Sequence, residues 1–196
     1  MVDLGKYFGH TKTSAGGGLC RCPKNTMSKI ILNTQRLRLE KIEKSHLNDL
    51  YALVSNPKVQ RYFPKTLNRN ETKEFYEKIQ NRYETDGYCY WAVVREGDNQ
   101  FIGICGILKQ EVDGQVETEI GYRILDMFWG KGYGTEAAEG CIKYAKEKLK
   151  KTSVISLIRS VNAPSKRVAE KNGLKFEKES IFHGLPHLVY RLLLKQ

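Results

Sequence analysis

The stretch "DMFWGKGYGTEAAEG", residues 126–140, places three glycines within five positions and then continues in a pattern typical of a helix. Glycine weakens regular structure because it loses more backbone freedom on folding than any other residue. A strand that enters a helix through closely spaced glycines brings consecutive backbone N–H groups together, and the helix dipole adds positive charge there. The stretch therefore fits an anion site, and it fits a tight turn with a close helix-to-sheet contact equally well.

Two common phosphate-binding motifs do not match this stretch. A Walker A loop needs Gly-Lys followed by Ser or Thr, whereas Gly130-Lys131 is followed by Gly132. A dinucleotide fingerprint of the form Gly-x-Gly-x-x-Gly needs a third glycine where Thr135 stands. A pyrophosphate held by the backbone of a strand-to-helix turn is the phosphate-binding hypothesis that remains.

Regular periodicities lead up to the glycines. Residues 36–42 alternate apolar and polar side chains as a half-buried strand does, and residues 47–54 then place apolar side chains at helical spacing. Residues 56–64 are bounded by prolines and are predicted to be irregular. Three strand-like runs follow, and their connections, Gly97-Asp98-Asn99 and Asp113-Gly114, are typical turn sequences. We therefore expect an antiparallel meander before the glycine stretch.

The segments after the glycines complete the predicted fold. A helix between two strands predicts a right-handed parallel crossover, and the predicted order is βααβββαβαββ. The predicted strands cover residues 36–42, 89–94, 101–108, 117–125, 153–160, 174–181 and 187–194, and the predicted helices cover residues 47–54, 75–83, 132–150 and 165–172.

The 196-residue length suits one well-buried core, with 40% hydrophobic and 28% charged residues. No run approaches the ~20 consecutive apolar residues of a membrane helix, so we expect no membrane partner. The net charge of +11 and the pI near 9.4 fit either a polyanion or a ligand with several phosphates. The densest lysine cluster, residues 146–151, ends a predicted helix, which favours a solvated helix end over a nucleic-acid surface.

The N-terminal residues 1–26 show no helical or strand periodicity, and their run Gly16-Gly17-Gly18 is typical of a flexible joint. We interpret them as a flexible leader or an expression remnant, with residues 27–196 as the domain. The five cysteines are an odd number without a secretory signal, which indicates reduced thiols and a cytoplasmic protein. Cys20 and Cys22 lack partners at metal-ligand spacing, so we expect no metal, and Cys105 and Cys141 are predicted to be core thiols.

Three ordered segments resemble a known family: "EIGYRI" (residues 119–124), "FWGKGYGTEA" (residues 128–137) and "NAPSKRVAEKNGLKF" (residues 162–176). They are similar to the Gcn5-related N-acetyltransferases (GNAT), in the branch of the ribosomal-protein N-terminal acetyltransferases. The resemblance covers about residues 34–195, because "TQRLRLEKI" and "SNPKVQRYFP" are similar to the opening segments of that branch. In the family's glycine loop, Gly132 and Gly134 match fixed positions, whereas Trp129 replaces the usual Arg or Gln.

The resemblance implies an α/β (α+β) fold with a mixed, mostly antiparallel seven-stranded sheet flanked by helices. Its fourth and fifth strands splay apart, and the pantetheine arm of acetyl-CoA pairs with backbone in the gap. The residues that the resemblance implies for binding this cosubstrate are the backbone edge Ile120, Gly121, Tyr122 and Arg123, the pyrophosphate loop Lys131, Gly132, Tyr133, Gly134 and Thr135, and Asn162.

Acetyl transfer to an amine needs a proton acceptor, because an ammonium group has no lone pair. The resemblance assigns this role to Glu119, and strand alternation places Glu117 on the same face, so both could reach the pocket or face solvent. The family's tyrosine acid is replaced by Ala169, which leaves Ser165, another hydroxyl or water as proton donor. Ser165 could equally cap its helix.

The acceptor cleft is expected to be bordered by aromatic and histidine side chains. We expect a primary amine, on a protein N-terminus or a small molecule, to receive the acetyl group by direct transfer. A non-catalytic acyl-CoA-binding or regulatory module of the same fold stays open, as do the monomer and the homodimer. The bordering residues implied by family placement are Tyr62, Phe63, Phe182, His183 and His187.

Overall fold

The middle of the fold is an antiparallel meander of β3 (Tyr90–Arg95), β4 (Gln100–Val112) and β5 (Gln115–Ile124). The β4–β5 connection is the two-residue turn Asp113-Gly114, in which both residues have positive φ angles of 50° and 75°. Such turns match the right-handed twist of the flanking strands. The meander predicted from the turn sequences is therefore confirmed.

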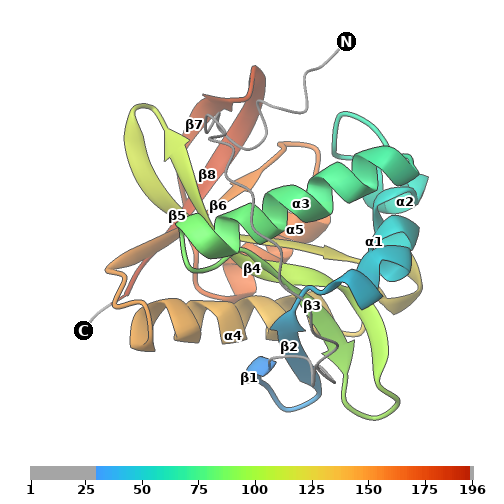
Figure 1. Cartoon of the computed structure of the whole chain (residues 1–196). Helices are drawn as coiled ribbons and strands as arrows, with labels where there is room; N and C mark the ends of the chain where they lie inside the picture. The colour runs from blue at the N-terminus through green and yellow to red at the C-terminus, as the bar shows by residue number, and fades with distance from the viewer. Residues whose placement is uncertain (1–29, 195–196) are drawn as a thin grey trace.

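A computed structural model describes residues 30–194, and the predicted leader, residues 1–26, lies outside them. The sheet has the order β1-β2-β3-β4-β5-β6-β8-β7, and β5 and β6 form its parallel pair (Figure 1). The mixed, mostly antiparallel sheet is thus confirmed. The bounds of its other strands are β1 (Ile30–Asn33), β2 (Leu37–Lys41), β6 (Ser153–Ile158), β7 (Lys175–Phe182) and β8 (Leu185–Leu193).

The sheet has eight strands where the sequence predicts seven. The additional strand, β1, is a four-residue edge strand whose side chains are exposed or half-buried. Because none of its side chains is fully buried, it lacks the apolar alternation by which a strand is recognised.

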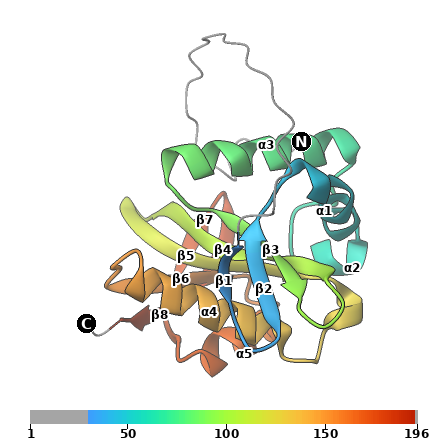
Figure 2. The ribbon, with the colours of Figure 1, turned by 60° about the horizontal axis from the view of Figure 1, so that its bottom comes forward.

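Helices cover both faces of the sheet (Figure 2). On one face, α1 (Leu47–Val54) and α3 (Arg69–Thr85) pack on β3 and β4 through a cluster that includes Leu53, Ile79 and Ile104. On the other face, α4 (Tyr133–Glu147) packs through Ala137 and Cys141. The Sγ atoms of Cys105 and Cys141 lie 3.4 Å apart as buried free thiols, so these cysteines are core thiols as predicted.

Local capping explains where three helices begin. Asn68 and Glu71 form a capping box, so α3 begins six residues before the predicted start. Asn56 caps a single turn, α2 (Pro57–Gln60), within a segment predicted to be irregular. α5 (Ala163–Lys171) likewise begins at Ala163 rather than Ser165, because a proline in the first turn needs no N–H partner. Within residues 30–194, no helix is both long and apolar enough to span a membrane.

Gly106 allows β3 and β4 to approach closely. A Cβ atom at this position would lie 2.2 Å from the carbonyl oxygen of Cys89 and 2.6 Å from the Cα of Tyr90. Both are backbone atoms of the neighbouring strand, which cannot move aside without breaking the ladder. A Cβ atom at Gly97, in the β3–β4 turn, would have no other atom within 4 Å.

We expect Gly106→Ala to lower the free energy of unfolding by about 3 kcal/mol, the upper end of the usual cost of overpacking. The matched variant Gly97→Ala should stay near the wild type. Urea denaturation of the three proteins measures both changes. Equal stability of the two variants would contradict the close approach of the strands.

Candidate active site

The two parallel strands β5 and β6 separate after a single register pair, Glu119 with Ile155. At the next position the hydroxyl of Ser156 donates to the carbonyl oxygen of Ile120 at 3.0 Å. The backbone N–H of Leu157 is directed at the carboxylate of Glu119. Side chains therefore satisfy the two backbone groups that the next rung of the ladder would have paired. The splay expected from the resemblance is present, and Ser156 is a residue that the sequence did not indicate.

The backbone N–H and C=O groups along the predicted edge of β5 face alternately toward the gap and toward β4. The carbonyls of Ile120 and Ile124 face the gap, because they accept hydrogen bonds from Ser156 and Trp129. Alternation along the strand then turns Tyr122 toward the gap, whereas Gly121 and Arg123 turn toward β4. The expectation that all four residues from Ile120 to Arg123 offer backbone to a ligand is therefore wrong for Gly121 and Arg123, which border the gap in other ways.

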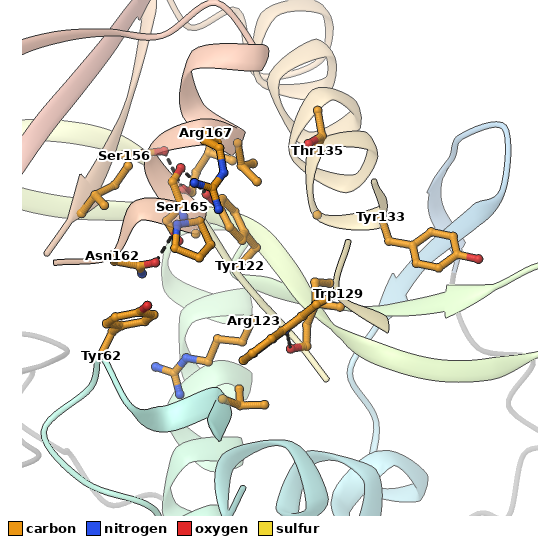
Figure 3. Close-up of a pocket in the computed structure, with 18 of the residues that line it drawn as sticks. Tyr62, Tyr122, Arg123, Trp129, Tyr133, Thr135, Ser156, Asn162, Ser165 and Arg167 are labelled. Carbon is orange, nitrogen blue, oxygen red and sulfur yellow. Dashed lines mark hydrogen bonds between the residues drawn. The ribbon is translucent and has the colours of Figure 1, made fainter. Parts of the chain in front are cut away.

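The gap opens into a cavity of about 500 Å³ (Figure 3). Its walls come from β5, from the glycine stretch, and from the beginnings of α4 and α5. The structure brings most of the predicted site together there. The predicted residues that line it are Glu119, Ile120, Gly121, Tyr122, Arg123, Gly132, Tyr133, Gly134, Thr135, Asn162 and Ser165.

The glycine stretch forms a turn with bare backbone at the start of α4. Gly130 and Gly132 have φ angles of 74° and 82°, which side chains disfavour, and Gly132 is the N-cap. The first bond of the helix runs from the N–H of Glu136 to the carbonyl of Gly132 at 3.0 Å. The N–H groups of Tyr133 and Gly134 thus have no acceptor within the helix, at its positive end. This geometry suits an anion.

Arg36 ties this turn to the edge of β2. Its Nη1 donates to the carbonyl of Lys131 at 3.2 Å, and its Nε donates to Glu136 at 2.7 Å. The guanidinium also lies 4.6 Å from the ring centroid of Tyr133. Figure 3 shows the Tyr133 side chain pointing away from the other labelled residues.

Lys131 does not line the cavity, contrary to expectation. Its Nζ lies 5.5 Å from the ring centroid of Phe128. Trp129 stands where the family has Arg or Gln. Its indole Nε1 donates a hydrogen bond to the carbonyl of Ile124 at 2.7 Å. Figure 3 shows Arg123 between Trp129 and Tyr62.

Glu119 lies half-buried in the cavity wall and accepts a 2.8 Å hydrogen bond from Gln110. Burial raises the pKa of this carboxyl above its usual value of 4.5, although Gln110, the Leu157 N–H and the charges of Arg82 and Arg123 act in the opposite direction. A carboxylate with a raised pKa is a better proton acceptor near neutral pH.

Glu117 does not reach the cavity. Arg191 of β8 donates to both of its oxygens, at 2.7 and 3.0 Å. The two glutamates share a strand face as predicted, but a bidentate ion pair holds Glu117 on β8, so the expectation that both reach the pocket is wrong.

The start of α5 brings three polar groups together. The side chain of Asn162 accepts from the N–H of Ser165 at 3.2 Å, so Asn162 is the cap and the capping role considered for Ser165 is wrong. The hydroxyl of Tyr122 donates to the carbonyl of Ser165 at 3.1 Å. Ala169, the position of the family's tyrosine acid, is buried and offers no hydroxyl.

A second cavity of about 80 Å³ adjoins Glu119, and three of the residues predicted to border the acceptor cleft, Tyr62, Phe63 and His187, line it. Phe182 and His183 line neither cavity, contrary to expectation. Phe182 packs in a separate core cluster at the end of β7, because its strand turns back there.

Comparison with known proteins finds similar sequences and similar folds. The sequence model of the acetyltransferase (GNAT) domain matches residues 36–175. The uncharacterized protein YkkB of Bacillus subtilis is 31% identical over 167 residues, covering 85% of this chain and 96% of YkkB. A GNAT-family acetyltransferase from Bacillus anthracis is 26% identical with a TM-score of 0.73, covering 84% of this chain and 98% of the other.

The fold also matches RimL, a ribosomal L7/L12 alpha-N-protein acetyltransferase solved in complex with coenzyme A. The TM-score is 0.70 at 16% identity, with 85% of this chain and 98% of RimL covered. The resemblance to that branch is therefore supported at the level of the fold.

The pKa of Glu119 predicts a pH-dependent effect on stability. A carboxyl whose pKa is raised in the folded state stabilises it fully below the ordinary value, and this contribution is lost as pH rises through the folded pKa. We expect Glu119→Gln to gain stability relative to the wild type as pH rises from 4 to 8. Urea denaturation at each pH measures the difference.

Asp113 provides a control of opposite sign. Lys178 and Ser180 hold the pKa of Asp113 below its usual value of 3.8, so its contribution is present above that value and is lost as pH falls. Asp113→Asn should therefore lose stability relative to the wild type as pH rises through the range below about 5, and the difference should be constant at higher pH. The same slope for both variants would show that Glu119 does not have a raised pKa.

Proposed function

The chain belongs to the GNAT acetyltransferase family, and on that premise we propose that it transfers the acetyl group of acetyl-CoA directly to a primary amine, with Glu119 as proton acceptor. GNAT N-acetyltransferases use acetyl-CoA. The observation that carries the proposal is the convergence of three features on one cavity. These are the gap between β5 and β6, the bare backbone at the start of α4, and the half-buried Glu119.

The residues of the cavity fit the parts of acetyl-CoA. The backbone N–H groups of Gly132 to Thr135 would hold the pyrophosphate, with the dipole of α4 behind them. The gap-facing carbonyl of Tyr122 would accept a hydrogen bond from a pantetheine amide, as it would from a neighbouring strand. Bound in this way, acetyl-CoA supplies an activated acyl carbon at the end of the gap nearest Glu119.

Glu119 takes the proton that the acceptor ammonium must lose, directly or through water. The amine nitrogen then forms a bond to the acetyl carbon as the carbon–sulfur bond breaks. A backbone N–H of the segment from Ile120 to Tyr122 polarises the carbonyl oxygen, and alternation along β5 favours Tyr122. Holding amine and thioester in line contributes much of the rate.

The departing thiolate takes a proton from a hydroxyl or from water. Ser165 lines the cavity and is our proposed donor. Tyr122 lies beside it, with its hydroxyl bonded to the Ser165 carbonyl, so the structure adds a second candidate from β5. Ser165 lies on the helix that carries Ala169 in place of the family's tyrosine, and the Tyr122 hydroxyl contacts the same helix.

A non-catalytic acyl-CoA-binding module is the alternative function, and Ala169 is the observation that favours it. Such a module would bind acetyl-CoA but release no free thiol with any amine. A thiol-release screen over amino acids, polyamines, aminoglycosides and N-terminal peptides separates the two functions.

The limits and location of the enzyme follow as proposals from the sequence. We propose residues 27–196 as the domain and residues 1–26 as a leader or an expression remnant. The unlinked thiols of Cys105 and Cys141 support a reducing compartment and thus the cytoplasm.

Glu119→Gln should lower kcat by about 10²- to 10⁴-fold, the usual contribution of a general base, and should flatten the pH profile of kcat/KM. The dissociation constant for acetyl-CoA should stay close to that of the wild type, because Glu119 serves the amine. Glu117→Gln, on the same strand face but outside the cavity, should retain kcat. Full activity of Glu119→Gln would remove Glu119 as the base.

Gly134→Leu should weaken acetyl-CoA binding by at least about tenfold, because a side chain there would occupy the space of the pyrophosphate. The fold should tolerate the change, since a Cβ at this position lies 3.8 Å from Ile124, an ordinary contact. Gly97→Leu, in the distant turn, is the control for binding. Isothermal titration calorimetry measures the affinity for acetyl-CoA. Unchanged affinity in Gly134→Leu would contradict the assignment of this loop to the pyrophosphate.

A further inference from the structure

The smaller cavity lies on the side of Glu119 away from the glycine stretch. Both cavities share Glu119, Arg123, Tyr62 and Phe63 as walls. The larger cavity alone contains the glycine stretch and the start of α4, whereas the smaller one alone reaches Arg159. Acetyl-CoA held at the glycine stretch would thus leave the smaller cavity to the acceptor.

Two guanidinium groups and one carboxylate line this smaller cavity. Arg159, just after β6, is half-buried, and within residues 30–194 no carboxylate lies at ion-pair distance from it. Arg123 comes from β5, and its guanidinium lies 3.8 Å from the ring centroid of Phe63 and 5.3 Å from that of Phe75. Stacking between aromatic rings restricts where this cation can move.

His187 lines the same cavity as a neutral side chain and does not change the charge set by the two arginines and Glu119. Its Nδ1 lies 2.8 Å from the carbonyl oxygen of Leu185, so Nδ1 carries a proton and donates it. Burial lowers the pKa of His187, and the positive charge of Arg159 lowers it further. The imidazole is therefore neutral near pH 7, and among the described residues that line the cavity Glu119 is the one carboxylate.

Resting on the proposed acetyl transfer, we infer that the acceptor is a primary amine that also carries an anionic group, a carboxylate or a phosphate. The amine lies at Glu119, and the anionic group lies against Arg159 and Arg123. Guanidinium groups match carboxylate and phosphate oxygens in geometry as well as in charge. A second ammonium group, as in a polyamine, would instead meet two arginines.

The volume of about 80 Å³ suits a compact head group of this kind. Gln110 also lines the cavity and provides a neutral amide beside the Glu119 carboxylate that it already binds. Tyr62 and Phe63 add apolar surface for the carbon skeleton of the acceptor. The smaller cavity thus combines a carboxylate for the amine, two guanidinium groups for the anionic group and an apolar surface for the carbon skeleton of the acceptor.

The test compares thiol release from acetyl-CoA with matched pairs of acceptors. Amino acids are compared with their amides, and ethanolamine phosphate is compared with ethanolamine, so that each pair differs in the anionic group. Spermidine is the cationic acceptor. The two kinds of pair distinguish a carboxylate source from a phosphate source. We expect the anionic member of at least one kind of pair to have the higher kcat/KM, by about tenfold or more, as for hydrogen bonds to a charged group.

Arg159→Gln should remove this preference. KM for the anionic acceptor should rise by about tenfold, whereas KM for its neutral partner and the affinity for acetyl-CoA should stay the same. Lys175→Gln removes a positive charge from the exposed surface of β7, away from both cavities, and should leave the preference intact. Higher kcat/KM for neutral acceptors or spermidine would overturn the inference, as would an equal loss for both members of a pair in Arg159→Gln.

Failure of the proposed function gives a different result. A chain that releases thiol with none of these amines is not an acetyltransferase of this kind. In that case the anion preference is still measured by calorimetry. The N-acetylated forms of the same acceptors are titrated into the protein in the presence of coenzyme A. Tighter binding of the acetylated acids or phosphate than of their neutral partners, lost in Arg159→Gln, supports the anion site, and equal binding overturns it.

Discussion

The separation of β5 from β6 after one register pair is the constraint on which the site depends. A parallel ladder that ends inside a sheet leaves backbone groups without partners, and each buried one costs free energy. Ser156 satisfies the Ile120 carbonyl, Glu119 receives the Leu157 N–H, and Trp129 satisfies the Ile124 carbonyl. These side chains stabilise an opening that would otherwise close into a continuous sheet, and they leave Tyr122 between them with backbone facing the gap.

Glu119 serves the fold, and would serve the proposed proton transfer, through the same carboxylate group. As a hydrogen-bond acceptor it helps to end the ladder, and as a half-buried carboxylate it has a raised pKa. Gln110 and the nearby arginines limit how far the pKa rises, so the group stays able to ionise. Burial and hydrogen bonding thus act against each other on one side chain.

The turn at the start of α4, our proposed anion site, is held by contacts from a distant segment. Positive φ angles at Gly130 and Gly132 bend the chain into the helix, and Arg36 holds the turn through the Lys131 carbonyl and Glu136. Hydrogen bonds from Thr34 and Arg36 outweigh burial and hold the pKa of Glu136 below its usual value, so this anchor stays ionised at neutral pH. The backbone that would face a pyrophosphate is thereby fixed from the far edge of the sheet.

The sequence by itself determined the order of the longer elements, the meander and the glycine turn, because each is encoded by spacing within one segment, whereas it missed β1 and α2. Glu119 was indicated by the family resemblance. Strand alternation also placed Glu117 on the face of Glu119, yet only the tertiary structure showed that Arg191, 74 residues later, holds it elsewhere. Ser156, Arg36 and Arg159 gave no local signal, since their roles depend on partners or cavity walls from distant segments. Periodicity reports which way a side chain faces, whereas its neighbours across the sheet depend on register and strand order, which only the folded chain decides.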